Sequence, residues 1–303
     1  MHVLRPRPLL PQLINTDRAA ADPAGARNLS TFVCTWMEAP AAELMARTAH
    51  VNLADLVQYP AFADMHAQCV RMLSRLYHAP QPAGGAEADI SAHMGAATVG
   101  STEAATLGAL ALKLKWRAAR RAAGLPADAP NLVMGHEAHL ALEKFCALFD
   151  VEPRFIDVSE EKRVMDPNAA VDAVDENTIG VIATLGSTYT GQFEDVAALD
   201  ALLGAKNAQR GWDVGIHVDA ASGGFIAPFT RPQLAWDFRL ARVRSLNVSG
   251  HKYGGVYCGI GWVLFRSREC VPDAMVFSTT YLGSTQESLT LNFSRPAAQL
   301  AAQ

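Results

Sequence analysis

Apolar residues recur along the chain with two alternating periods, one typical of amphipathic helices and one typical of buried strands. An alanine- and leucine-rich segment at residues 102–122 has the helical period, and Gly124 and Pro126 follow it, so we expect a helix there. Short apolar runs come next, at residues 131–134, 154–158, 179–185, 215–218 and 245–248. Most of these runs are separated by segments of helical period, such as residues 138–149 and 194–209.

This alternation predicts an α/β fold. Strands that alternate with helices are joined by right-handed crossovers, and they form a largely parallel sheet that helices cover on both faces. In such sheets ligands bind beyond the carboxyl ends of the strands. We expect one large domain at residues 28–303, preceded at residues 1–27 by an N-terminal arm that is rich in proline, alanine and arginine and lacks a sustained period.

The composition is that of a soluble globular protein, since 50% of the 303 residues are hydrophobic and 18% are charged. A formal net charge of -4 gives no electrostatic reason to expect nucleic acid or an anionic membrane as a partner. The longest nearly apolar stretch, residues 254–265, is shorter than a membrane span. No apolar run near the N-terminus is long enough for a signal peptide.

The five cysteines are scattered, and no two of them are spaced as Cys-x-x-Cys. Because their number is also odd, neither a disulfide framework nor a zinc site is indicated. His136 and His139 could supply half of a metal site, but no third ligand is evident near them, and we expect no metal. A reducing compartment fits best, and we expect a cytoplasmic protein.

The strongest local signal is Ser249-Gly250-His251-Lys252, which follows the apolar run at residues 245–248 and precedes the glycine-rich Tyr253-Gly254-Gly255. A lysine at the end of a strand, inside a loop of small residues, is placed to form a Schiff base with an aldehyde cofactor. Taken alone, a lysine is more often an ordinary solvated surface residue, and only other evidence favours a covalent role for Lys252.

A second signal is the acid in His217-Val218-Asp219, which ends another predicted buried strand and is followed by Ser222-Gly223-Gly224. A buried carboxylate needs a partner, because an isolated buried charge is too costly. The protonated nitrogen of a pyridine ring would be such a partner, and the anion would keep that ring an electron sink. A turn or capping aspartate remains the alternative at Asp219.

The third signal is Gly100-Ser101-Thr102-Glu103, at the start of the predicted helix. Free backbone N–H groups, two hydroxyls and the positive end of the helix dipole make a phosphate cradle. A plain N-cap with an acid in the first turn explains the same residues. Only the combination is specific, because a phosphate cradle, a buried acid and a reactive lysine, in this order on an α/β pattern, describe a pyridoxal-phosphate site.

Several ordered motifs make the chain resemble the glutamate decarboxylases of bacteria and plants from Asn28 to its last residues. The motifs are Asn28-Leu29-Ser30-Thr31-Phe32, Gly186-Ser187-Thr188-Tyr189-Thr190-Gly191, His217-Val218-Asp219-Ala220-Ala221-Ser222-Gly223-Gly224-Phe225, Trp236-Asp237-Phe238-Arg239-Leu240, Ser249-Gly250-His251-Lys252-Tyr253-Gly254 and Asn292-Phe293-Ser294. The resemblance implies the large domain of the pyridoxal-phosphate-dependent transferase-like fold (fold type I). It also implies decarboxylation of L-glutamate to 4-aminobutanoate and carbon dioxide.

The resemblance further implies a role for each matching residue. Lys252 would bind the cofactor aldehyde as a Schiff base, Asp219 would pair with the pyridine nitrogen, and Thr188 would lie beside the ring. The residues implied to contact the phosphate or its surroundings are Ser101, Thr102, Ser249, His251 and, from the neighbouring subunit, Ser294. A homodimer or higher homo-oligomer with shared active sites is therefore expected. The residues that match the family's pocket for the substrate's distal carboxylate are Thr31, Phe32, Asn52 and Asp55.

Two of these positions qualify the interpretation. Asp55 would bring a second carboxylate against the substrate, and two carboxylates in contact share a proton, so acidic pH should favour binding; a turn cap before Tyr59-Pro60 is the alternative. His139 stands where close relatives usually carry glutamine stacked on the pyridine ring. An imidazole there can stack and can exchange protons near the carbanion, so His139 is both a cofactor-binding and a catalytic candidate.

The chain stops at Gln303, shortly after the Asn292-Phe293-Ser294 motif, whereas family members continue. We therefore expect the C-terminal small domain, which supplies an arginine for the substrate's α-carboxylate, to be absent. Three other functions stay open at this point: a decarboxylase of another acidic amino acid such as aspartate, a non-catalytic remnant, and an aminotransferase of the same fold.

Overall fold

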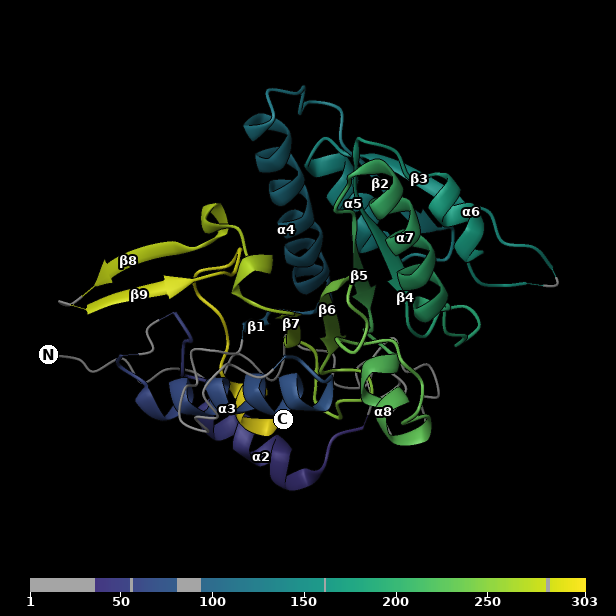
Figure 1. Ribbon diagram of the computed structural model, residues 1–303. Coiled ribbons are helices and arrows are strands. Elements are labelled where there is room, and N and C mark those ends of the chain that lie inside the picture. Colours follow the sequence, from purple (N-terminus) through teal and green to yellow (C-terminus); the bar gives the residue numbers. More distant parts are fainter. Residues whose placement is uncertain (1–35, 55–56, 81–93, 161, 282–283) are drawn as a thin grey trace, which may run out of the picture.

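The computed structural model describes residues 36–54, 57–80, 94–160, 162–281 and 284–303 (Figure 1). The predicted N-terminal arm and three of the predicted substrate-binding residues, Thr31, Phe32 and Asp55, lie outside the described residues.

A seven-stranded sheet forms the centre of the described chain, in the strand order β1-β7-β6-β5-β4-β2-β3. The strands are β1 (Gly95–Thr98), β2 (Asn131–Gly135), β3 (Glu152–Ile156), β4 (Thr178–Thr184), β5 (Gly215–Asp219), β6 (Val243–Ser249) and β7 (Gly261–Phe265). Neighbours from β3 to β6 pair in parallel, whereas β7 is antiparallel to both β6 and β1. The sheet is therefore mostly parallel, as the alternating pattern predicted.

All five apolar runs marked in the sequence lie on strands, namely β2 to β6. Within this sheet the pattern missed β1 and β7, which lie at one side of it. The four residues of β1, Gly-Ala-Ala-Thr, are small and carry a weak strand signal. β7 is the second half of the apolar stretch at residues 254–265, whose glycine-rich first half obscures the beginning of the strand.

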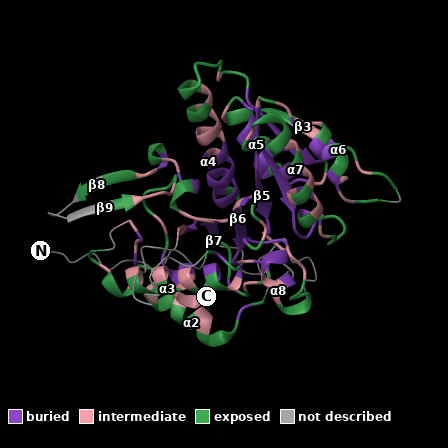
Figure 2. Ribbon diagram, viewed as in Figure 1, coloured by how far each residue is buried: buried purple, intermediate pink, exposed green. Residues whose placement is uncertain are grey.

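Helices cover both faces of this sheet (Figures 1 and 2). The helices are α2 (Ala39–Thr48), α3 (Pro60–Leu76), α4 (Ser101–Ala122), α5 (Leu140–Leu148), α6 (Pro167–Asp172), α7 (Val196–Arg210), α8 (Ala227–Thr230) and α9 (Ala298–Ala302). α4 and α5 pack on one face, and α3, α6, α7 and α9 contribute to the core on the other. The two faces alternate along β4, where Val181 and Ala183 face the α7 side and Ile182 faces the α4 side.

α4 crosses the sheet and confirms the helix predicted at residues 102–122. Nine of its residues between Glu103 and Leu112 are buried, whereas its last turn carries Arg120 and Arg121. These cations lie at the negative end of the helix dipole, where they are favourable. The positive end, at Ser101, lies at the edge of the sheet where β5 and β6 end, since Ser101 shares a cavity with Asp219 and Ser249.

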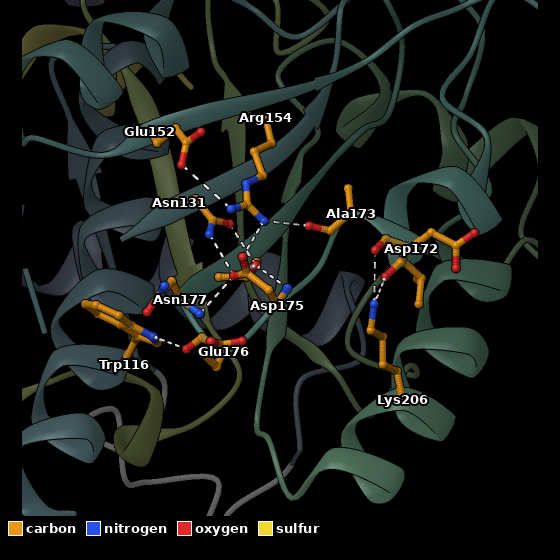
Figure 3. A network of polar contacts seen from close by, with 12 residues as sticks. Trp116, Asn131, Glu152, Arg154, Asp172, Ala173, Asp175, Glu176, Asn177 and Lys206 are labelled. Atoms are coloured by element: carbon orange, nitrogen blue, oxygen red, sulfur yellow. Dashed lines mark hydrogen bonds and ion pairs between the residues drawn. The ribbon is translucent and has the colours of Figure 1, made fainter. Parts of the chain in front are cut away.

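A polar network holds the opposite edge of the sheet, at the amino ends of β2 and β4 (Figure 3). Asp175 accepts hydrogen bonds from Asn131 at 2.8 Å and from the backbone N–H of Asn177 at 2.9 Å, and it pairs with Arg154 at 2.7 Å. Arg154 also donates to the carbonyl of Ala173 at 2.9 Å. These contacts fix β2, β3 and β4 relative to one another at the edge that does not carry the predicted site.

Short elements complete the described chain. They are η3 (Gly223–Phe225), η4 (Arg268–Cys270), η5 (Asp273–Met275), β8 (Phe277–Tyr281) and β9 (Ser284–Ser288). β8 and β9 form a separate two-stranded antiparallel sheet that extends away from the central sheet (Figure 1).

Candidate active site

The carboxyl ends of the parallel strands surround a cavity of about 670 Å³. Its lining comes from the loops after β1, β2, β4, β5 and β6, from the first two turns of α4, from α5 and the residue that follows it, and from residues 291–292. Eight residues singled out in the sequence line this cavity: Ser101, Thr102, His139, Thr188, Asp219, Ser249, His251 and Lys252. The fold thus brings together residues that are up to 151 positions apart in the chain, at the edge of the sheet where a ligand was expected.

Lys252 is only 7% exposed, and its Nζ donates a hydrogen bond to Ser222 Oγ at 3.3 Å. Burial lowers the pKa of the Lys252 ammonium, whereas the nearby charge of Asp219 acts in the opposite direction. A lysine with a lowered pKa has a larger share of neutral amine at neutral pH. Lys252 therefore has the environment of a nucleophile rather than that of a solvated surface lysine.

Asp219 ends β5 and is 5% exposed. Its Oδ1 accepts hydrogen bonds from Asn247 Nδ2 at 2.9 Å and from the backbone N–H of Ala221 at 3.1 Å. Hydrogen bonds to the ionised form favour that form. Asp219 thus presents a carboxylate to a cavity that also contains a buried amine.

The first turn of α4 has the features of a phosphate cradle. No side chain caps this helix at Gly100, so its first backbone N–H groups remain available to a ligand. Ser249 Oγ donates a hydrogen bond to Ser101 Oγ at 2.7 Å. The start of β7 also packs closely against this turn. Its first residue must be glycine, because a Cβ at Gly261 would lie 2.6 Å from the backbone nitrogen of Ser101.

Glu103, in the same turn, is buried and also lines the cavity. Its carboxylate accepts hydrogen bonds from the backbone N–H groups of Val99, Leu291 and Asn292, at 2.8, 2.8 and 3.2 Å. These donors satisfy the hydrogen-bonding capacity of a buried carboxylate. Glu103 therefore links the segment around Asn292 to the phosphate cradle.

His251 and His139 line the cavity with different degrees of freedom. Nδ1 of His251 is buried and has no hydrogen-bond partner among the described residues. Burial, and secondarily the charge of Lys252, lowers the pKa of His251. His139 caps α5, since its Nδ1 accepts a hydrogen bond from the backbone N–H of Ala141 at 3.1 Å. The acceptor role of Nδ1 places the ring hydrogen of neutral His139 on Nε2.

Two predicted residues do not line the cavity. Asn52 Oδ1 instead accepts hydrogen bonds from the backbone N–H groups of Ala54 and Arg295, each at 3.0 Å, and so joins two distant parts of the chain. Ser294 lies just beyond Asn292, which does line the cavity. Neither Asn52 nor Ser294 therefore contacts the same space as Lys252 within a single chain.

The histidine that raised the question of a metal has other contacts. His136 stacks on Phe155 with ring centroids 4.8 Å apart, and it pairs with the exposed Asp157 at 3.0 Å. In the part of the chain that the structure describes, no group of three or more histidine, cysteine or acidic side chains could hold a metal ion.

Sequence reasoning assigned no role to Ser222, although it lies in a quoted motif, and it missed Glu137 and Asn247. Ser222 and Glu137 line the cavity, and Asn247 binds Asp219. A signal for Asn247 was present, because Ser245, Asn247 and Ser249 alternate with apolar residues along β6. That period-2 pattern indicates one polar face on a buried strand.

Comparison with known proteins decides the family. A family model described as the pyridoxal-dependent decarboxylase conserved domain matches residues 26–302. The chain belongs to this family. This match confirms the family and the pyridoxal cofactor that the motifs implied, and the mostly parallel sheet confirms the fold.

Several relatives are glutamate decarboxylases. Glutamate decarboxylase 3 of Arabidopsis thaliana is 50% identical over 292 residues, which are 96% of this chain and 57% of that protein. A glutamate decarboxylase of Solanum lycopersicum is 49% identical, with the same coverage of 96% and 57%. The solved glutamate decarboxylase of Lactobacillus brevis CGMCC 1306 superposes with a TM-score of 0.87 at 39% identity, over 100% of this chain and 68% of that one. The chain thus spans less than two thirds of the length of these plant relatives.

Across the described ranges, every helix is too short or too polar to cross a bilayer.

Proposed function

We propose that the chain is the cofactor-binding part of a glutamate decarboxylase, a carbon–carbon lyase that converts L-glutamate into 4-aminobutanoate and carbon dioxide. The observation that carries the proposal is the placement of a buried lysine, Lys252, and a buried carboxylate, Asp219, on one cavity with an uncapped helix N-terminus. The names of the relatives, at 39–50% identity, favour glutamate among the possible amino acids.

The residues of the cavity fit pyridoxal phosphate. The first turn of α4, with Ser101 and Thr102, would hold the phosphate, and the unpartnered Nδ1 of His251 would add a further contact. Lys252 would hold the aldehyde carbon, and Asp219 the ring nitrogen. When bound, pyridoxal phosphate supplies an electron sink for the pair of electrons that carbon dioxide leaves behind.

The protein residues would then orient the reactants and manage protons. Asp219 would hold a proton at the ring nitrogen, and Thr188 would fix the edge of the ring. His139, from the start of α5, would stack on the ring and carry its hydrogen at Nε2. Loss of carbon dioxide rather than of the α-proton requires the scissile bond to stand perpendicular to the ring, so a grip on the substrate's distal carboxylate is part of the proposal.

That grip would come from the residues matched by resemblance, Thr31, Phe32, Asn52 and Asp55. Within the single chain Asn52 lies outside the cavity, which favours a shared site in which one subunit completes the pocket of another. Exposed apolar side chains near the cavity are consistent with a homo-oligomer, since Leu291 is 54% and Phe293 47% exposed. Ser294, next to Phe293, would reach the neighbouring subunit's phosphate.

The proposed location is the cytoplasm. The scattered cysteines, odd in number, are typical of a reducing compartment, and nothing in the net charge of -4 favours a membrane surface.

A visible absorption spectrum of the purified chain with added pyridoxal phosphate, before and after borohydride, tests the proposal. We expect an absorption band that borohydride abolishes as it fixes the cofactor on Lys252, and no such band in Lys252→Ala. Lys144→Ala is the matched control, because Lys144 lines the same cavity but is exposed. A borohydride-fixed cofactor in Lys252→Ala would contradict the assignment.

Product analysis tests the reaction. Incubation with L-glutamate should release carbon dioxide and 4-aminobutanoate in equal amounts. Release of a keto acid would identify an aminotransferase, and turnover of aspartate in preference to glutamate would change the substrate. If the chain binds the cofactor but releases no product, it is a non-catalytic binding protein and not an enzyme.

A further inference from the structure

A chain of buried hydrogen bonds runs beneath Asp219, outside the cavity. Ser245 Oγ lies 2.7 Å from His217 Nδ1, His217 Nε2 lies 2.8 Å from Asn247 Oδ1, and Asn247 Nδ2 lies 2.9 Å from Asp219 Oδ1. Ser245 is 1% exposed, and both His217 and Asn247 are 0% exposed. These groups are therefore separated from solvent, and each must satisfy the others.

The direction of every hydrogen bond in this chain can be assigned. The carboxylate of Asp219 only accepts, so Asn247 must turn its amide nitrogen toward Asp219 and its oxygen toward His217. His217 Nε2 then donates to that oxygen. Burial lowers the pKa of His217, although the charge of Asp219 opposes this effect, so the ring is neutral and its Nδ1 accepts from Ser245. All the donors point toward Asp219.

Helix α4 is shaped to admit this imidazole. A Cβ at Gly108 would lie 2.2 Å from His217 Nδ1 and 2.3 Å from Cε1, so any larger residue would displace the ring. Glycine in the middle of a helix is destabilising relative to alanine. α4 nevertheless has glycine where the imidazole passes, which argues that the position of His217 is required by more than the packing of the helix.

Both assigned donors to Asp219 reach the same oxygen. Asn247 Nδ2 and the backbone N–H of Ala221 bind Oδ1, which leaves Oδ2 for a ligand in the cavity. Each donor stabilises the ionised carboxylate. A proton shared between Asp219 and a bound pyridine nitrogen would therefore be driven toward the nitrogen.

We propose that His217 and Asn247 are positioning residues that keep Asp219 ionised and aim its free oxygen at the ring nitrogen of the bound cofactor. This inference rests on the proposed function. His217 acts only through Asn247: it fixes which end of the amide faces the carboxylate. Without His217, the amide could turn and present its oxygen to Asp219, which would remove a donor and add a repulsive contact.

The test uses pyridoxal phosphate labelled with ¹⁵N in the ring and bound to the full chain. The ¹⁵N chemical shift of the ring separates a protonated nitrogen from a neutral one. In the unaltered protein we expect the protonated signal. In His217→Leu we expect the signal to move toward that of neutral pyridine, and the affinity for pyridoxal phosphate to fall on the order of tenfold, because one hydrogen bond to a charged group is lost. His217→Gln, which keeps one donor and one acceptor, should restore much of both.

Two further variants separate this role from stability alone. Gly108→Ala should displace the imidazole without removing it, and it should shift the ¹⁵N signal in the same direction as His217→Leu. Asn207→Ala is the matched control, because Asn207 is a buried amide that makes two hydrogen bonds to Val214 and none to the Asp219 chain. It should lower stability and leave the ¹⁵N signal unchanged.

The outcomes distinguish the two proposals. If the unaltered protein does not fix pyridoxal phosphate on Lys252, the proposed function fails, and this inference fails with it. If it does, and His217→Leu and Gly108→Ala bind the cofactor with the protonated ¹⁵N signal intact, only the positioning role is overturned. Should His217→Leu not fold, Gly108→Ala and His217→Gln still decide the question.

Discussion

The hydroxyl of Ser249 donates a hydrogen bond to that of Ser101 at 2.7 Å, and this contact joins the end of β6 to the start of α4. Ser249 stands three residues before Lys252, and Ser101 begins the helix that would bind the phosphate. The groups proposed to hold the two ends of the cofactor are thus parts of one hydrogen-bonded unit. Movement at one end would be transmitted to the other.

Removal of this link should weaken cofactor binding. In Ser249→Ala we expect the affinity for pyridoxal phosphate to fall roughly three- to tenfold, because a hydrogen bond next to the proposed phosphate site is lost. Titration followed by absorbance measures the change. Thr230→Ala removes a hydroxyl that donates to the backbone carbonyl of Ile226 and does not line the cavity, so it should leave the affinity unaltered. Equal affinities in the two variants would contradict the coupling.

His139 caps α5 and is also proposed to stack on the cofactor, and the two contributions can be separated. Asparagine is a good N-cap but has no aromatic ring, so His139→Asn should keep the stability of the protein and lose affinity for the cofactor. His139→Ala should lose both, with a fall of about 1 kcal/mol in the free energy of unfolding. Urea denaturation and absorbance titration measure the two effects.

A cap elsewhere provides the control for His139. Asp195 caps α7 through the backbone N–H of Ala198 at 2.9 Å. Asp195→Ala should therefore lower stability without any change in cofactor affinity. If His139→Asn binds the cofactor as well as the unaltered protein does, the ring has no part in binding.

Glu194 should make stability depend on pH. Burial raises its pKa from 4.5 to about 7, although hydrogen bonds from the backbone N–H groups of Thr184 and Met165 act in the opposite direction. The folded state therefore holds a proton that the unfolded state releases. The contribution of Glu194 to stability is complete below pH 4.5 and is lost as the pH rises through about 7. Because a tenfold change in proton affinity is worth about 1.4 kcal/mol, the total is on the order of 3 kcal/mol.

Glu194→Gln removes this titration. Urea denaturation between pH 4.5 and 7.5 should show that the variant loses less stability with rising pH than the unaltered protein does. His66 changes stability with pH in the opposite direction, because burial lowers its pKa to about 4. His66 is present in both proteins, so the difference between their slopes reports on Glu194 alone. Glu43→Gln, at an exposed position in α2, should keep the slope of the unaltered protein. Identical slopes for all three proteins would refute the assignment.

Removal of the charge of Asp219 should lower the pKa of Lys252 and so increase the share of neutral amine at a given pH. Burial lowers the pKa of Lys252 and the charge of Asp219 raises it, so Asp219→Asn should lower that pKa further. The pH dependence of the rate at which pyridoxal phosphate reacts with Lys252 should therefore have its midpoint below 10.5, and the midpoint should be lower still in Asp219→Asn. A higher midpoint in the variant would show that the charge of Asp219 does not reach the amine.

The sequence predicted most of the sheet and the local parts of the site. The apolar runs predicted β2 to β6 because parallel strands are buried on both faces, and the motifs around Asp219 and Lys252 follow directly from strand ends. The chain from His217 to Asn247 could not be predicted, since it depends on the register between β5 and β6. Asp219 pairs with Asn247 only because the register shifts between Ile216 and His217. A slip of one residue would turn Asn247 to the other face.

Asn52 shows a different limit of sequence reasoning. Its expected role came from resemblance alone, and within one chain its side chain joins Ala54 and Arg295 instead of lining the cavity. Local pattern contains no information on which subunit completes a site. The contribution of Asn52 to substrate binding therefore stays a prediction.

The reversal of β7 determines how Lys252 is tethered. Because β7 is antiparallel to β6, Gly261 pairs with Ser249, and the backbone N–H of Gly250 binds the carbonyl of Ile260 at 3.2 Å. The segment that carries the lysine, residues 250–260, is therefore held at both ends by contacts between the end of β6 and the start of β7. The backbone on either side of Lys252 is thus restrained. When a substrate amine replaced the Lys252 amine on the proposed cofactor, Lys252 would have to move away by rotation about the bonds of its own side chain.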